Sequence, residues 1–362
     1  MSLRKVALRP APPWVWLSAL ALLVIAGCGG GEKFPQSTLV PKGDFAVMVD
    51  EVFMTTVKWA AVVFVLVEGA LLIALWRFRQ RPGLGEPEQV HGNALLEVIW
   101  TLIPAAILAL IAVPTVRAIF RTSELPEDAL EIEVIGHQWW WEFRYPNQLI
   151  VTANEMHVPA GRPVLLKIRA ADVLHSFWVP QFAAKRDAFP GKYTTLWFTT
   201  DSVGTFSGQC AEFCGIQHAR MGSLVVVQPP EEFERWVAKE QVGSPLMNSG
   251  VVTWATPADS IVAAQDSVEI RGRAAFMAGG CLGCHAMVGT PTAGLLSLQG
   301  PNLSHLGGRQ RLAAGILAQT PENLARWLRE PQVVKEGSLM KLPRPLTEDE
   351  VGALVAYLRA HR

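Results

Sequence analysis

The sequence of 362 residues lacks any excess of charge, because 32 lysines and arginines balance 32 aspartates and glutamates. This balance gives no support for a nucleic-acid-binding protein or a polybasic membrane-binding arm. Cysteine is also scarce, with five residues at Cys28, Cys210, Cys214, Cys281 and Cys284. Two disulfides and one spare thiol would account for this number, but each group of cysteines has a chemistry of its own. The length predicts two or three folded units, each with its own core.

The N-terminus has the residue order of a secretory signal. Three basic residues precede an apolar run from Trp14 to Ala26, and Cys28 follows directly after small residues. This order resembles the lipobox of bacterial lipoproteins, which predicts a signal peptide over residues 1–27 and a mature chain that begins at a lipidated Cys28. A plain signal peptide, or an uncleaved anchor with an incidental cysteine, is the alternative.

Two apolar runs, at about residues 57–76 and 97–117, have the length that a bilayer requires. They predict a transmembrane hairpin, which together with the preceding N-terminal segment occupies residues 28–122. Arginines cluster directly after the first run, which indicates that the connecting loop is cytoplasmic. Everything after residue 121 is therefore expected on the outer face.

Charged side chains inside such runs are costly and are candidates for function. Glu68 lies in the middle of the first run, where proton transport and pairing with a partner subunit both remain open. Glu97 lies at the cytoplasmic end of the second run, on the side from which a membrane enzyme takes up protons.

After residue 122 the pattern changes to short β-rich runs separated by turn residues, which predicts a β-sandwich or barrel over residues 123–237. Within it, two thiolates, an imidazole and a thioether fall inside twelve residues, and a second histidine stands far upstream; the five are His175, Cys210, Cys214, His218 and Met221. Soft ligands favour copper or an iron–sulfur cluster, and the distant histidine favours copper. Two cysteines four residues apart let two sulfurs bridge two metal ions. Zinc and a disulfide are the competing interpretations, which the flanking histidines and methionine disfavour.

With these residues the chain resembles subunit II of cytochrome c oxidases, over roughly residues 45 to 237. The resemblance implies a cupredoxin-like domain with a dinuclear copper centre (CuA), ligated by His175, Cys210, Cys214, His218, Met221 and the backbone carbonyl of Glu212. It also implies that the Glu212 side chain reaches a magnesium ion at the boundary with subunit I, and that Glu97 stands at the entrance of a proton channel. Quinol oxidase subunits share the fold but lack the copper ligands, so a cytochrome is the expected electron donor.

Three adjacent tryptophans lie within residues 137–143. Neighbours on a strand alternate sides, so all three cannot face one core, and at least one is expected at the surface or an interface. The resemblance implies that Trp139 is the residue at which electrons enter beside the copper, whereas core or subunit packing is the alternative for the others.

Residues 238–268 are poor in aromatic residues and contain several glycines, prolines and serines, which predicts a linker. Cys281, Cys284 and His285 then form the C-x-x-C-H motif of c-type haem attachment, in which both thiols bond to the haem and the histidine binds the iron. A redox dithiol with a chance histidine is the alternative. The motif and the helix-rich sequence around it predict an all-α class I cytochrome c domain over residues 269–362, with a capping box before the last helix.

Three methionines of this segment are candidates for the sixth ligand of the haem iron. Met277 and Met287 are close to the haem motif in the chain, so the short connection keeps them on the same side of the haem as His285. Met340 lies 55 residues after His285, in a proline-rich loop. Met340 is therefore the expected ligand, and filling a gap in the core is its alternative role. Resemblance to the fused oxidase cytochromes also favours Met340, although they usually have Met-Pro where this chain has Met340 and Lys341.

The sequence thus predicts a subunit of an oxygen-reducing respiratory oxidase. Electrons from cytochrome c are expected to pass through the haem and the copper to haem in subunit I, where oxygen is reduced with proton translocation. Subunit III is a further expected partner, and a bacterial cell membrane is the expected location. A freestanding membrane-anchored electron carrier or copper-storage lipoprotein is the competing function, but it needs neither two spans nor Glu97. Nitrous oxide reductase also carries such a copper domain, but its catalytic domain is absent here.

Overall fold

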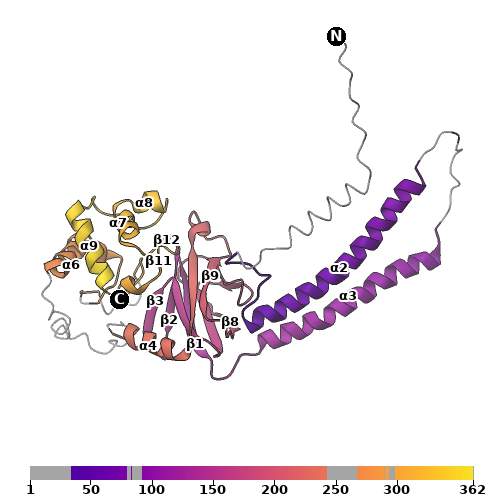
Figure 1. The fold of residues 1–362 in the computed structure, drawn as a ribbon, viewed down its shortest axis with the longest axis horizontal. Helices are drawn as coiled ribbons and strands as arrows, with labels where there is room; N and C mark the ends of the chain where they lie inside the picture. Colours follow the sequence, from indigo (N-terminus) through magenta and orange to yellow (C-terminus); the bar gives the residue numbers. More distant parts are fainter. Residues whose placement is uncertain are drawn as a thin grey trace, which may run out of the picture.

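The computed structural model describes residues 34–79, 83, 92–242, 267–288, 290–292 and 298–361. A helical hairpin, a β-sandwich and a small helical domain follow one another along the molecule (Figure 1). The expected signal peptide, Cys28 and most of the expected linker lie outside the described residues.

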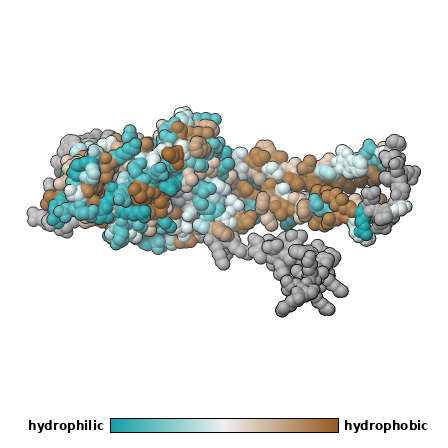
Figure 2. Space-filling view, turned by 90° about the horizontal axis from the view of Figure 1, so that it is seen from above, coloured by the Kyte–Doolittle hydropathy of each residue, from teal (hydrophilic) through white to brown (hydrophobic). Residues whose placement is uncertain are grey.

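The hairpin consists of α2 (Asp44–Arg77) and α3 (Ala94–Ser123). Both helices extend beyond the expected spans. An uncharged run marks only the segment that can lie in the hydrocarbon core of a bilayer, whereas the hydrogen bonds of the helix backbone continue into the polar residues at its ends. Each helix is long and apolar enough to cross a membrane, and no residue of its most apolar stretch is buried in the described structure. Apolar side chains accordingly cover much of the hairpin surface (Figure 2).

Two five-stranded sheets pack face to face as a sandwich, with the strand orders β3-β2-β1-β5-β8 and β4-β10-β9-β6-β7. The pairs β1 with β5 and β4 with β10 are parallel, and the other neighbours are antiparallel. The strands are β1 (Leu130–His137), β2 (Trp140–Tyr145), β3 (Ile150–Ala153), β4 (Glu155–Pro159), β5 (Val164–Ala170), β6 (His175–Trp178), β7 (Arg186–Ala188), β8 (Thr194–Phe198), β9 (Gly204–Cys210) and β10 (Gly222–Gln228).

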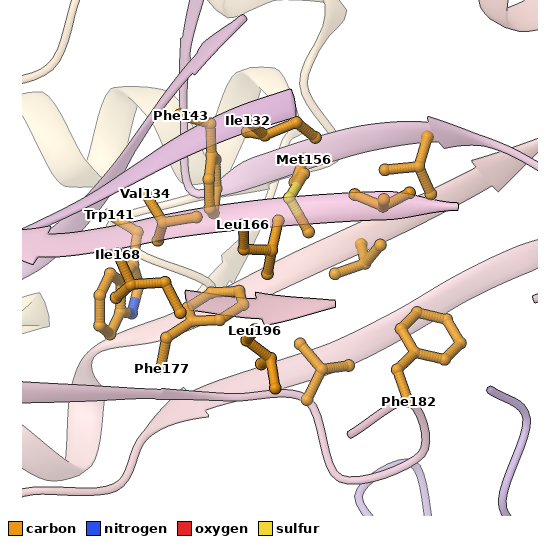
Figure 3. Packing of buried hydrophobic residues seen from close by; sticks show 14 of the residues in the cluster. Ile132, Val134, Trp141, Phe143, Met156, Leu166, Ile168, Phe177, Phe182 and Leu196 are labelled. Atoms are coloured by element: carbon orange, nitrogen blue, oxygen red, sulfur yellow. The ribbon is translucent and has the colours of Figure 1, made fainter. Parts of the chain in front are cut away.

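The core of the sandwich lies between the two sheets. Burial alternates along β5, as expected for a strand with one face toward a core. Leu166 from β5 and Phe143 from β2 of the same sheet lie in this core with Phe177 from β6 of the facing sheet (Figure 3). This packing fixes β6 and β9, the two strands that carry the first copper-ligand candidates.

Two contacts tie the hairpin to the sandwich. The Asp44 carboxylate accepts a hydrogen bond of 2.7 Å from the backbone of Thr199, and the Trp197 indole donates one of 3.1 Å to the carbonyl of Thr122. The sandwich continues into α4 (Pro230–Glu240), whose Phe233 is buried against the sheets. This helix ends three residues beyond the domain boundary at 237 that the sequence predicted. Its apolar face packs on the sandwich core, so the helix belongs to that domain.

The C-terminal domain is helical, with a two-residue ribbon of β11 (Arg311–Leu312) and β12 (Leu317–Ala318). Helices α6 and α9 cross closely at Gly272, where a Cβ atom would lie 2.3 Å from that of Tyr357. Thr347 and Glu350 form the expected capping box at the start of α9. The helices are α6 (Ser267–Ala278), α7 (Pro321–Arg329), α8 (Pro331–Val334) and α9 (Glu348–Ala360).

Candidate copper and haem sites

Three segments bring the predicted copper ligands together. His175 opens β6, Cys210 ends β9, and the others lie in the loop that leads from β9 to β10. We call residues 210–221 the copper loop. Because β6 and β9 are paired, the upstream histidine lies beside the first cysteine.

The ligand atoms form a compact cluster. Cys210 Sγ lies 3.8 Å from Cys214 Sγ and 3.9 Å from His175 Nδ1. Cys214 Sγ lies 3.8 Å from His218 Nδ1 and 3.9 Å from Met221 Sδ. Each sulfur thus has one imidazole beside it, as two metal ions that share both sulfurs would require.

The competing interpretations fit this cluster less well. A disulfide has sulfurs about 2.05 Å apart, and the two cysteines are free at 3.8 Å. Structural zinc takes four ligands. Here the possible ligands are five side chains and, in addition, the carbonyl of Glu212, which lies 3.2 Å from Cys210 Sγ. The donor set therefore fits a dinuclear copper centre.

The two thiols are electrostatically coupled. The neighbouring thiol of Cys214 lowers the pKa of Cys210 to about 3, and the Cys210 sulfur in turn raises the pKa of Cys214. One thiolate thus forms readily, whereas the second needs a cation beside it. Metal ions held by these residues would supply that cation.

Asp172 belongs to the site and was not predicted. Its Oδ1 lies 2.8 Å from Nε2 of His175, so that Nδ1 remains directed at the sulfur of Cys210. A carboxylate behind a ligating histidine fixes the orientation and protonation of the ring. The only signal in the sequence was an aspartate three residues before a histidine.

The three tryptophans occupy three environments. β1 ends at His137 and β2 begins at Trp140, so Trp139 lies in the turn between the strands and not on a strand. Its indole donates a hydrogen bond of 3.0 Å to the carbonyl of Cys214. Trp141 is fully buried in the sandwich core. Trp140 points to the opposite side, where its indole donates to the carbonyl of Gln299 in the helical domain.

A cavity lies at the face of the helical domain that meets the sandwich. Cys281, Cys284, His285 and Met340 line it, and Trp139 and Trp140 of the sandwich complete its wall. The rest of the wall is mostly apolar and includes Phe276, Leu303, Leu306, Leu324, Trp327, Leu328, Leu354 and Leu358. An apolar cavity with two thiols and an imidazole on its wall fits a covalently attached haem.

His285 is prepared to bind a metal. Its Nδ1 lies 2.8 Å from the carbonyl of Pro301, so Nε2 is left for the iron. Burial lowers the pKa of His285, which keeps the imidazole neutral. The ring is packed against Gly300, where a Cβ atom would come within 2.4 Å of His285 Cε1.

The methionines differ in position. Met340 is the one methionine on the cavity wall among the described residues. Met287 is fully buried in the core of the helical domain, and Met277 is 45% exposed. The arrangement therefore favours Met340 over the other two as a ligand.

Buried contacts hold the helical domain against the sandwich. The carboxylate of Glu155 accepts hydrogen bonds of 2.7 Å from the backbone of both Gln310 and Arg311. The amide of Gly222 donates to the carbonyl of Ala314 at 3.0 Å. The cavity and the copper ligands therefore lie on either side of one interface.

The two acidic residues that the sequence singled out within the membrane spans lie far from this interface. Glu97 is in the first turn of α3, at the end of the hairpin away from the sandwich (Figure 1). Glu68 is half-buried within α2.

Comparison with known proteins decides the family. Sequence profiles match for the cytochrome c oxidase subunit II transmembrane domain over residues 42–118, its periplasmic domain over 146–228 and cytochrome c over 270–362. Cytochrome c oxidase subunit 2 of Alkalihalophilus pseudofirmus is 35% identical over 369 residues, which cover 99% of this chain and 98% of that protein. The chain belongs to the cytochrome c oxidase subunit II family. It carries a cytochrome c domain at its C-terminus and is a membrane-associated subunit of a haem–copper oxidase.

Further known proteins are similar to the chain. Cytochrome c oxidase subunit 2 of Bacillus subtilis is 32% identical, with 95% of this chain and 96% of that protein covered. Quinol oxidase subunit 2 of Bacillus cereus is 30% identical, with 65% of this chain and 82% of that protein covered. The crystal structure of the periplasmic domain of subunit II (CoxB) of Bradyrhizobium japonicum is similar at 32% identity and a TM-score of 0.33, with 33% of this chain and 99% of that chain covered.

Proposed function

We propose that this subunit accepts electrons from cytochrome c at its haem, passes them to its dinuclear copper and delivers them to haem in subunit I, where oxygen is reduced and protons are translocated. One observation carries the proposal. Trp139 forms part of the wall of the haem cavity and also donates a hydrogen bond to the carbonyl of Cys214. A single side chain therefore touches both candidate redox sites.

The haem would be held by covalent bonds to Cys281 and Cys284, and its iron would be bound by His285 and Met340. Histidine–methionine ligation gives such a haem a raised reduction potential, which suits a carrier that accepts electrons from cytochrome c. The protein supplies an apolar cavity, an oriented neutral imidazole and the loop that presents Met340.

The copper ions would be held by His175, Cys210, Cys214, His218, Met221 and the carbonyl of Glu212. A dinuclear centre of this kind transfers single electrons, and the protein fixes its ligands between paired strands so that they move little. Because these residues are all present, the proposed donor is a cytochrome and not a quinol.

The hairpin would anchor the subunit in a bacterial cell membrane beside subunits I and III, with both redox domains on the outer face. Glu97, at the far end of the hairpin, is proposed to stand at the entrance of a proton channel. The Glu212 side chain is proposed to reach a magnesium ion at the boundary with subunit I. Cys28 is proposed as a site of lipidation.

Purification of the complete complex tests this function. We expect a subunit with additional haems to copurify, and oxygen consumption with reduced cytochrome c but not with a quinol. Trp139→Phe should slow electron transfer from haem c to copper without loss of either cofactor. A chain that purifies without a haem-containing partner would instead support the freestanding carrier.

A further inference from the structure

Lys335 is a buried lysine at the interface of the two redox domains. It directly follows α8, and only 4% of its surface is exposed. Its Nζ donates a hydrogen bond of 2.9 Å to the carbonyl of Trp139 and one of 3.5 Å to the carbonyl of Ala313. No carboxylate forms an ion pair with it among the residues that the structure describes.

Burying an ammonium group without a counter-ion is costly. The cost is visible in the pKa of Lys335, which burial lowers to about 7. A lysine that only filled space could be replaced by an apolar side chain of the same length. What a methionine or leucine cannot do is donate to carbonyls of both domains.

Lys335 also begins the loop that ends at Met340. The amide of Ser338 donates to the carbonyl of Lys335 at 3.0 Å, and the amide of Met340 donates to the Ser338 hydroxyl at 3.2 Å. The side-chain amide of Gln332 donates to the carbonyls of both Ser338 and Met340, at 2.8 and 2.9 Å. These bonds make residues 335–340, which we call the methionine loop, a rigid unit.

The copper loop contacts the same unit. At Gly337 a Cβ atom would lie 2.9 Å from Ile216 Cγ2, so the two loops are in direct contact. The guanidinium group of Arg220 reaches the carbonyl of Val334 at 3.4 Å. Lys335 thus joins a rigid loop of the haem domain to Trp139, whose indole is bonded in turn to Cys214 of the copper loop.

We propose that Lys335 is a positioning residue for electron transfer, which holds the methionine loop on the carbonyl of Trp139 and so keeps the haem domain docked at the copper loop. The proposal rests on the proposed relay from haem to copper. Docking by buried hydrogen bonds makes the rate of this step independent of a diffusive search, because the two sites are already in contact.

The salt dependence of the electron-transfer rate distinguishes docking by buried hydrogen bonds from docking by attraction between surface charges. Residues 123–240 contain 15 acidic and 10 basic side chains, whereas residues 263–362 contain 8 and 11. These net charges alone predict a rate that falls as salt rises. Buried contacts predict a rate that salt does not change, since screening acts mainly on exposed charges.

The test uses the complete oxidase, with electrons injected rapidly at haem c and the absorption of haem and copper followed in time. Lys335→Met should slow transfer about tenfold, the factor that corresponds to the loss of one hydrogen bond at the interface, and should make the rate fall with ionic strength. The spectra of both cofactors should not change. Lys239→Met removes a lysine charge from an exposed position on α4, away from the cavity wall, and should keep the wild-type rate.

Two results would overturn the proposal. One is a Lys335→Met variant that carries both cofactors and transfers electrons at the wild-type rate at all salt concentrations. The other needs no variant: a wild-type rate that falls steeply with ionic strength. If the wild type transfers no electrons from haem to copper at all, the proposed relay itself fails, and this outcome is distinct from the other two.

Discussion

Gly300 gives the sharpest test of how the C-terminal domain holds His285, the histidine that is proposed to bind the haem iron. A Cβ atom at this position would lie 2.4 Å from Cε1 and 2.8 Å from Nδ1 of His285, closer than such atoms approach in proteins. The ring cannot swing away freely, because its Nδ1 is bonded to the carbonyl of Pro301 and its side chain is buried. We therefore expect Gly300→Ala to force the imidazole, the loop or both out of place.

The size of the effect follows from two opposing contributions. Overpacking a core costs about 1–3 kcal/mol. Where the backbone conformation allows it, replacing glycine by alanine stabilises the fold by about 0.4–1 kcal/mol, because alanine lowers the conformational entropy of the unfolded chain. The cost of the clash exceeds this gain, so the free energy of unfolding of the domain should fall by about 1–2 kcal/mol. For a domain of this size the Tm should fall by about 4–8 °C for each kcal/mol.

Thermal unfolding followed at the absorption band of the proposed haem measures this loss, and the reduction potential of that haem reports displacement of His285. Gly352→Ala is the matched control, because its Cβ would meet nothing within 4 Å on the exposed side of α9. Alanine has the higher helix propensity by about 0.8–1 kcal/mol, so this control should be as stable as the wild type or more so. If Gly300→Ala unfolds within about 2 °C of the wild type and keeps its potential, the clash has been misjudged.

Four further changes are predicted. Met340→Ala should abolish the methionine–iron charge-transfer band and let the reduced haem bind carbon monoxide, and loss of the band in Met287→Ala instead would reverse the assignment. Glu155→Ala should remove the acceptor of the Gln310 and Arg311 amides at a cost of about 0.5–1.5 kcal/mol each, seen as faster hydrogen exchange at those amides, whereas Glu155→Gln keeps an acceptor oxygen and should retain protection; equal exchange in both variants would contradict this. Glu97→Gln should slow turnover but leave reduction of the copper fast, and normal turnover would remove its role in proton uptake. The intact mass of the purified subunit should correspond to a chain that begins at a diacylated Cys28, and an unmodified residue 28 or a chain starting at Met1 would end that idea.

The fold class could be predicted from the sequence because its signals are local. Long uncharged runs predicted the two membrane-length helices, and short β-rich runs between turn residues predicted the sandwich. The structure and the family comparison confirm both, together with the cytochrome c domain. The motifs that suggest chemistry are local too, since Cys281, Cys284 and His285 are adjacent in the chain, as are most residues of the copper loop.

What the sequence could not decide are contacts between residues far apart in the chain. Trp139 was assigned to a strand, but it lies in a turn, because pairing of β1 with β2 and not side-chain preference sets where the strands end. Asp172, Gly300 and Lys335 are unremarkable in the sequence, and each gains its role only from the ring or carbonyl that folding brings beside it.

The amino-acid sequence by itself therefore determined which chemical groups this subunit possesses and in which kind of element each lies, because periodicity and short motifs are properties of neighbouring residues. Only the tertiary structure decided how the groups are combined. The docking of the haem domain on the sandwich joins Met340, Lys335, Trp139 and Cys214 across about 200 residues of chain. Such contacts arise from packing and from the need of buried polar groups for partners, and neither is written in any local stretch of sequence.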